Sequence, residues 1–111
     1  MTEASKAPKV HDEFIQRYPA LGEAWDNIRE AESSGPLDER TLRLLKVAIA
    51  VGSLKEGAVH SSVRKAMAAG ISREELQQVV ALVASTVGMP STVAVYSWVM
   101  EEVEGRKKRR D

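Results

Sequence analysis

Hydrophobic residues recur every three or four positions through most of the chain, with polar residues between them. This period places the apolar side chains on one face of an α-helix. Pro19 interrupts the first such stretch at a point where a second helix can begin. The pattern therefore predicts an all-α protein of about six helices. The expected segments are 10–18, 19–35, 39–52, 53–70, 72–88 and 89–105.

Short capping patterns mark several of the expected helix boundaries. Asp38 precedes one apolar stretch and is a favourable N-cap residue. Two Ser-x-x-Glu patterns, Ser53 with Glu56 and Ser72 with Glu75, predict capping boxes that open the next two helices. The last two segments are rich in Val and Thr, which also suit strands. Their length, caps and spacing nevertheless favour helices.

The chain of 111 residues is long enough for one domain with a modest core. We expect a flexible lead-in over residues 1–9, a single helical domain over 10–105 and a basic tail over 106–111. The tail, RKKRRD, offsets an acidic body, so the formal net charge is zero. It has no aromatic partners beside it, so we interpret it as a solvated end and expect no nucleic-acid partner.

The chain contains no cysteine. This absence excludes disulfides, thiol redox catalysis and thiolate metal sites within the chain. The first ten residues, MTEASKAPKV, lack an apolar signal core, and no apolar run reaches the length that spans a bilayer. We therefore expect a cytoplasmic protein with no membrane partner.

One long stretch resembles a known enzyme family. It reads LDERTLRLLKVAIAVGSLKEGAVHSSVRKAMAAGISREELQQVVALVASTVGMPSTVAVYSWV. Its strongest piece is SSVRKAMAAGISREEL, in which Ala66, Gly70, Glu74 and Glu75 match a helical hairpin pattern. The stretch resembles the carboxymuconolactone decarboxylase and alkylhydroperoxidase D family. The resemblance implies a bundle of helical hairpins that assembles into closed homo-oligomeric rings.

The reactive residues of that family are replaced in this chain. Its peroxidase branch uses a C-x-x-C-x-x-x-H motif, and the register puts its cysteines at Lys55 and Ala58 and its histidine at Ser62. A glutamate that commonly precedes the motif falls at Arg43. The resemblance therefore does not imply cysteine-dependent peroxidase activity here. The decarboxylase branch, which works by proton transfer on a lactone carboxylate, is also expected to use the histidine at the Ser62 position.

Glu56 and His60 are the candidate catalytic pair. They lie four residues apart, which puts them on one face of a helix. Histidine is a common proton carrier near neutral pH, and a neighbouring carboxylate can exchange protons with it. Two alternatives remain open, because Glu56 can instead serve as a capping-box acid and His60 can pack on the surface or at a subunit interface. His60 also points about 200° away from the Ser62 position, so it cannot replace the family histidine directly.

Arg43, Ser62 and Arg64 are the candidate substrate-binding residues. Arginines can hold a carboxylate, and the serine can donate a hydrogen bond. The alternative for the arginines is a solvated helix face. Glu56 and His60 offer only two metal ligands with no third nearby in the sequence, so we expect no metal and no other cofactor.

Two functions fit these residues. In the first, the protein does acid–base chemistry, a decarboxylation or isomerisation, on a small carboxylate or lactone. In the second, it is a catalytically silent scaffold or a small-ligand-binding protein. In either case we expect a homo-oligomer, because the segment VVALVASTVGM is apolar around most of its circumference. The closed rings that the resemblance implies point the same way, and we expect a hexamer in preference to a trimer.

Overall fold

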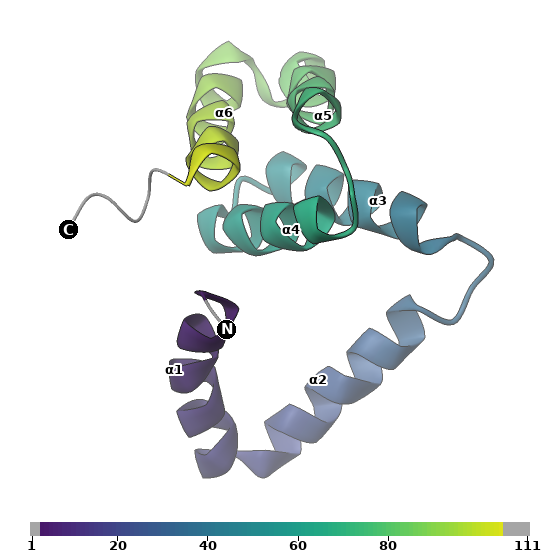
Figure 1. Ribbon diagram of the computed structural model, residues 1–111, viewed down its shortest axis with the longest axis vertical. Helices are drawn as coiled ribbons and strands as arrows, with labels where there is room; N and C mark the ends of the chain where they lie inside the picture. Colours follow the sequence, from purple (N-terminus) through teal and green to yellow (C-terminus); the bar gives the residue numbers. More distant parts are fainter. Residues whose placement is uncertain (1–2, 106–111) are drawn as a thin grey trace. The chain divides into compact units, whose positions relative to one another are not determined.

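The computed structural model describes the backbone of residues 3–105 and the side chains of residues 9–105. The described residues form six helices and no strand (Figure 1), which confirms the predicted all-α class. None of these helices has the length and apolar character needed to cross a bilayer. The predicted basic tail, 106–111, lies outside the described residues. The helices are α1 (Glu3–Arg17), α2 (Pro19–Glu32), α3 (Glu39–Gly52), α4 (Glu56–Ala68), α5 (Arg73–Val87) and α6 (Met89–Glu104).

The chain divides into two compact units, Met1–Pro36 and Leu37–Asp111. The single domain that the pattern predicts over residues 10–105 stays a prediction. The first helix also begins at Glu3, inside the stretch that the pattern predicts to be a lead-in. Ala and Lys are good helix formers and are frequent there, so a helix can extend through this stretch without an apolar stripe.

The first unit is the pair of helices α1 and α2 (Figure 1). They are joined at Tyr18, and Pro19 lies in the first turn of α2, as predicted. Gly22 allows the two helices to approach closely. A Cβ atom added at Gly22 would lie 2.6 Å from Cγ2 of Ile15, which is shorter than any normal contact. The absence of a side chain at Gly22 is therefore what lets Ile15 pack against the backbone of α2.

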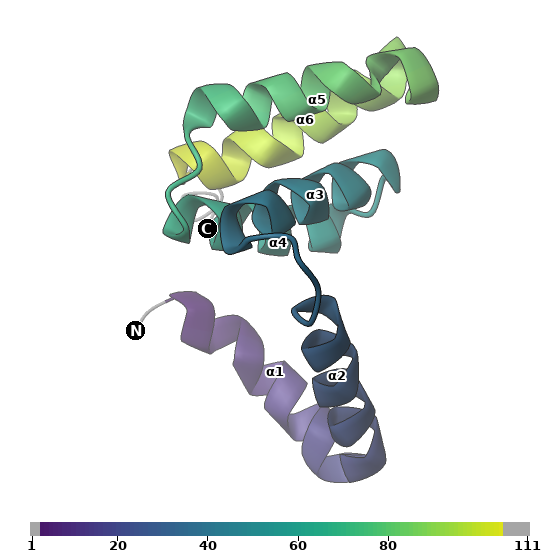
Figure 2. The same cartoon turned by 90° about the vertical axis from the view of Figure 1, so that its right-hand side faces the viewer.

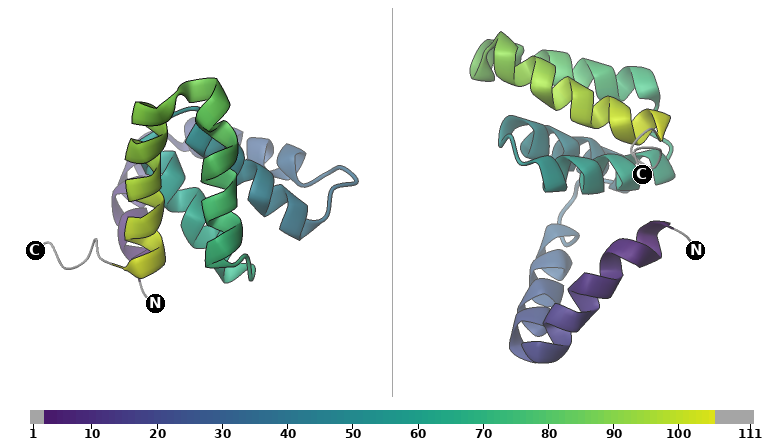
Figure 3. Two further views of the ribbon diagram at one scale, coloured as in Figure 1. Left: turned by 90° about the horizontal axis from the view of Figure 1, so that it is seen from above. Right: turned by 90° about the vertical axis from the view of Figure 1, so that its left-hand side faces the viewer.

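The second unit consists of two helical hairpins, α3–α4 and α5–α6, packed face to face. Figures 2 and 3 show them as two layers, with α6 lying against α4 and α5 against α3. Valine and other small aliphatic side chains from all four helices fill the space between the layers, as the shortage of aromatic residues requires. The buried core contains Val47, Ala50, Val51, Val59, Val63, Ala66, Ile71, Leu76, Val79, Val80, Val95 and Val99.

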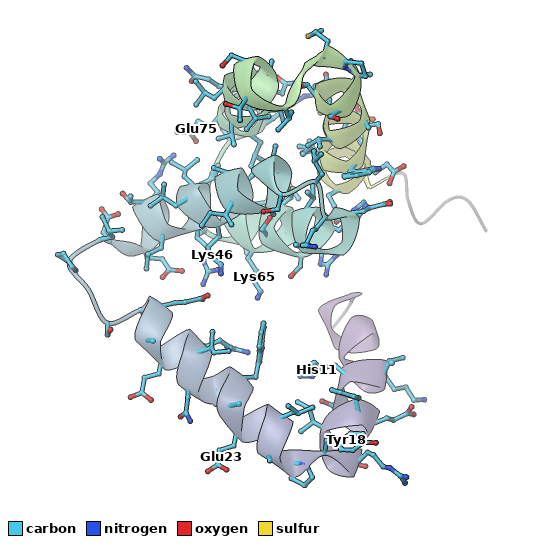
Figure 4. All side chains as sticks on the ribbon, turned by 180° about the vertical axis from the view of Figure 1, so that it is seen from behind. His11, Tyr18, Glu23, Lys46, Lys65 and Glu75 are labelled. Atoms are coloured by element: carbon cyan, nitrogen blue, oxygen red, sulfur yellow. The ribbon has the colours of Figure 1, made fainter. Side chains whose placement is uncertain are left out.

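Two of the predicted caps are confirmed. Oδ1 of Asp38 accepts a hydrogen bond from the backbone N–H of Thr41 at 2.8 Å. Ser72 and Glu75 form the predicted capping box, in which each side chain accepts a hydrogen bond from the other's backbone N–H. Glu75 (Figure 4) also accepts hydrogen bonds from Arg40 at 2.6 and 2.7 Å. The Arg40 guanidinium, with help from the Ser72 backbone, lowers the pKa of Glu75 to about 2.

The capping box predicted at Ser53 and Glu56 is wrong. Ser53 is the C-cap of α3, and its backbone N–H donates to the carbonyl of Ile49. Its backbone is still near the helical conformation, whereas an N-cap residue must be extended. Lys55 takes the extended N-cap position of α4 instead, without a side-chain cap. Glu56 is therefore the first residue of α4, and its carboxylate is available for other contacts.

The two serines differ in a measurable way. We expect Ser72→Ala to lower the free energy of unfolding by about 1 kcal/mol, because the N–H of Glu75 loses its partner. The matched variant Ser53→Ala should change it by less than about 0.5 kcal/mol, because the exposed Ser53 is not an N-cap. Urea denaturation of both variants measures the difference. Equal losses would contradict the assignment of a single capping box.

Candidate functional site

The candidate site lies where α4 packs against α6. His60 is on the first half of α4, one turn after Glu56, and its side chain is only 7% exposed. Glu101 and Glu102 are near the end of α6, and their side chains are 21% and 10% exposed. The hairpin packing thus brings a buried imidazole together with acids that are about 40 residues away in the sequence.

The shortest contact of His60 is with Glu102. Its Nδ1 lies 2.8 Å from Oε2 of Glu102, within the range of a strong, charge-assisted hydrogen bond. The carboxylate accepts, so Nδ1 carries the proton of this hydrogen bond. Nη1 of Arg64 donates to the same Oε2 atom of Glu102 at 3.2 Å. Glu102 therefore orients the imidazole ring and is itself held by a cation.

The other ring nitrogen of His60 lies between two carboxylates. Its Nε2 is 3.4 Å from Oε2 of Glu56 and 3.6 Å from Oε1 of Glu101. Both distances exceed the usual 2.9 to 3.0 Å or so of an N–H···O hydrogen bond. A proton on Nε2 would be attracted to both carboxylates, and the ring would then be a doubly donating imidazolium. Glu56, with a side chain 57% exposed, is the member of the cluster that reaches solvent.

The structure brings together three of the five predicted site residues. Glu56 and His60 are in contact, and Arg64 joins them through Glu102. The other two, Arg43 and Ser62, contact residues on their own helices. Arg43 forms an ion pair at 2.9 Å with Glu39 on its own helix, as expected for a surface i,i+4 pair. Ser62 is buried, and its hydroxyl donates to the backbone carbonyl of Val59 at 3.2 Å.

Glu101 and Glu102 are the residues that sequence reasoning missed. A signal for Glu102 was present, because Val95, Val99 and Glu102 follow one another at steps of four and three. This spacing continues the buried face of α6 through an ionisable residue. An acid on a core-facing stripe requires a partner, and His60 on the neighbouring helix provides it.

From the sequence no metal is expected, because Glu56 and His60 offer only two ligands, and the structure adds a third residue to this pair. Glu56, His60 and Glu101 each offer one ligand atom, and these atoms all lie within 4.8 Å of one another. Glu101 therefore supplies the third ligand that could not be found in the neighbouring sequence. The donor set, one imidazole and two carboxylates, is one that divalent transition cations accept.

The comparisons with known proteins decide the family. The model of the carboxymuconolactone decarboxylase family matches residues 19–101, which is most of the chain. The chain belongs to the carboxymuconolactone decarboxylase family. This match confirms the resemblance identified from the sequence, and it runs from the start of α2 as far as Glu101 in α6.

A solved structure shares the fold. It is a carboxymuconolactone decarboxylase family protein from Legionella pneumophila, similar with a TM-score of 0.78 and 21% sequence identity. The alignment covers 90% of this chain and 90% of that one. No curated protein matches the chain. At this identity the neighbour establishes the fold, and the chemistry has to be argued from the residues of this chain.

Proposed function

We propose that this family member does cofactor-free acid–base chemistry on a small carboxylate or lactone. The supporting observation is the row of groups Glu102, His60 and Glu56, which runs from a buried carboxylate through the imidazole to an exposed one. Each neighbouring pair lies within 3.4 Å. Such a row can move a proton between the interior and a substrate bound at the surface.

The reaction that fits is decarboxylation of a lactone that carries a carboxylate. Loss of CO₂ leaves the bonding electron pair on carbon, and that carbon must then take up a proton. In this proposal Glu56, the exposed member, delivers the proton and His60 returns one to Glu56. One proton taken up from solvent in each turnover restores the starting state. Glu102 is a positioning residue that keeps the ring in place, as a carboxylate behind a catalytic histidine does. Arg64, whose side chain is 37% exposed, is the better placed arginine to hold the substrate anion.

The test is an assay of the purified protein with carboxymuconolactone-type lactones, measuring both CO₂ release and loss of the lactone. Treating the protein with a chelator beforehand removes adventitious metal. We expect turnover above a no-protein control that persists after this treatment. Absence of turnover from a folded sample across such lactones would contradict the proposal and favour the alternative below.

The second candidate is a silent scaffold or small-ligand-binding protein. The burial of His60 favours it, because both ring nitrogens already face carboxylates of the same chain. A buried, internally paired histidine can serve to fix how two helices pack. In that case His60 and the carboxylates beside it would stabilise the fold and would take part in no reaction.

Self-association is proposed for either function. Large apolar side chains are exposed on α5 and α6, among them Leu82, Met89 and Val93. Exposed apolar surface on a small protein is a common feature of subunit interfaces. We propose a homo-oligomer, a hexamer in preference to a trimer. Sedimentation velocity at micromolar concentration should show such an assembly, and a single species of 12.2 kDa would exclude it.

A further inference from the structure

We propose that Glu56, His60 and Glu101 form a binding site for one divalent transition cation of the Zn²⁺ type. The ligand atoms would be Nε2 of His60 and one carboxylate oxygen from each acid. Binding of the cation rests on the geometry of the cluster. Its effect on turnover, described below, rests on the proposed function.

The distances within the cluster suit metal ligands better than hydrogen bonds. Two ligand atoms about 2.1 Å from a shared tetrahedral ion lie about 3.4 Å apart. Nε2 of His60 is 3.4 Å from Oε2 of Glu56 and 3.6 Å from Oε1 of Glu101. All three ligand atoms lie within 4.8 Å of one another, so a cation between them would reach bonding distance to each once the two carboxylates turn toward it. The partial exposure of Glu56 leaves room for water as a further ligand.

A second observation, outside the three ligands, points the same way. Glu102 accepts the proton of Nδ1 of His60 at 2.8 Å. In the neutral ring this contact fixes the tautomer, so the lone pair is on Nε2 and is directed at Glu56 and Glu101. A carboxylate behind a histidine is the usual support of a metal-binding imidazole. A lone pair facing two carboxylates is repulsive unless a proton or a cation lies between them.

The charges of these groups also fit a divalent ion. Three carboxylates lie beside His60, and the guanidinium of Arg64 pairs with one of them, that of Glu102. Carboxylates gathered around one imidazole attract a doubly charged cation more strongly than a singly charged one. His60 and Glu101 are also largely withdrawn from solvent, which strengthens their attraction for a doubly charged ion, while Glu56 stays exposed.

The proposed site uses the same nitrogen that would carry the proton during turnover. A bound cation occupies the lone pair of Nε2 and both neighbouring carboxylates. Proton exchange between His60 and Glu56 is then blocked. We therefore infer that a divalent transition cation inhibits the reaction and that a chelator restores it.

Binding is tested first without any activity measurement. Chelator-treated protein is titrated with Co²⁺, and the visible absorption of the bound ion is recorded, followed by displacement with Zn²⁺. We expect one cation per chain and at least about tenfold weaker binding in Glu101→Gln. This variant keeps the size of the side chain and removes only its charge, and circular dichroism checks that it is folded.

Two matched variants control for adventitious binding. Glu104→Gln removes an acid from the same helix, one that pairs with Arg73, and His11→Ala removes the other histidine of the chain. Both should bind Co²⁺ as the unchanged protein does. The proposal is overturned if Glu101→Gln also binds normally, or if His11→Ala alone loses the ion.

The two proposals fail separately. Lactone turnover without Co²⁺ binding would overturn the cation site and leave the acid–base function in place. Co²⁺ binding at the expected residues without any lactone turnover would overturn the acid–base function and leave the cation site in place. Turnover that Zn²⁺ inhibits, with recovery after chelation, supports both.

Discussion

Glu102→Ala is expected to lower the free energy of unfolding by about 3 kcal/mol. The substitution removes the carboxylate that contacts both Nδ1 of His60 and the guanidinium of Arg64. His60 is almost fully buried, so its Nδ1 would lose the hydrogen-bond partner that orients the ring. Arg64 is partly exposed and can turn to water, which limits its share of the loss.

Glu104→Ala is the matched control for this prediction. It also replaces a glutamate of α6 by alanine. Oε2 of Glu104 lies 3.5 Å from Nη2 of Arg73, and the Arg73 side chain is half-exposed. A surface ion pair of this kind contributes no more than about 1 kcal/mol. Urea denaturation at one protein concentration compares the variants while any self-association is held constant. Equal losses in the two variants would show that Glu102 and His60 do not form a buried pair.

The helices were predictable because their signals are local. Apolar spacing and the caps at Asp38 and Ser72 depend on residues within one or two turns, and the structure confirms them. Ser53 has the same Ser-x-x-Glu spacing as Ser72 and does not cap a helix. The backbone of α3 continues up to it, so Ser53 cannot take the extended conformation that an N-cap requires.

The candidate site was only half predictable, for a related reason. Glu56 and His60 are one helical turn apart, so their contact follows from spacing alone. The contact of His60 with Glu102 depends on how α4 packs against α6, and no local spacing encodes that packing. An acid in the core-facing register of α6 indicated that a partner was needed but did not identify it.

The division of the chain also depends on packing that periodicity does not specify. An apolar stripe shows which face of a helix is buried, but it does not show which other helix packs against that face. The close contact between Gly22 and Ile15 joins α1 to α2 within their own unit. The stripe over residues 10–35 was therefore compatible both with one domain and with two units.

His60→Gln is expected to reduce kcat/KM for a lactone substrate by at least about 100-fold. Glutamine can still donate a hydrogen bond to Glu102, so much of the packing between α4 and α6 should be retained. It cannot take up and release a proton near neutral pH, because an amide does not titrate in that range. The row from Glu102 to Glu56 would then be interrupted at its centre.

The ratio of kcat/KM between His60→Gln and the unchanged protein measures whether His60 carries the proton during turnover. His11→Gln is the matched control, since it alters the other histidine, which is exposed and lies near Asp12. Circular dichroism and urea denaturation establish that each variant is folded before it is assayed. We expect a loss of at least about 100-fold for His60→Gln and none for His11→Gln. Undiminished turnover by a folded His60→Gln variant would contradict this expectation.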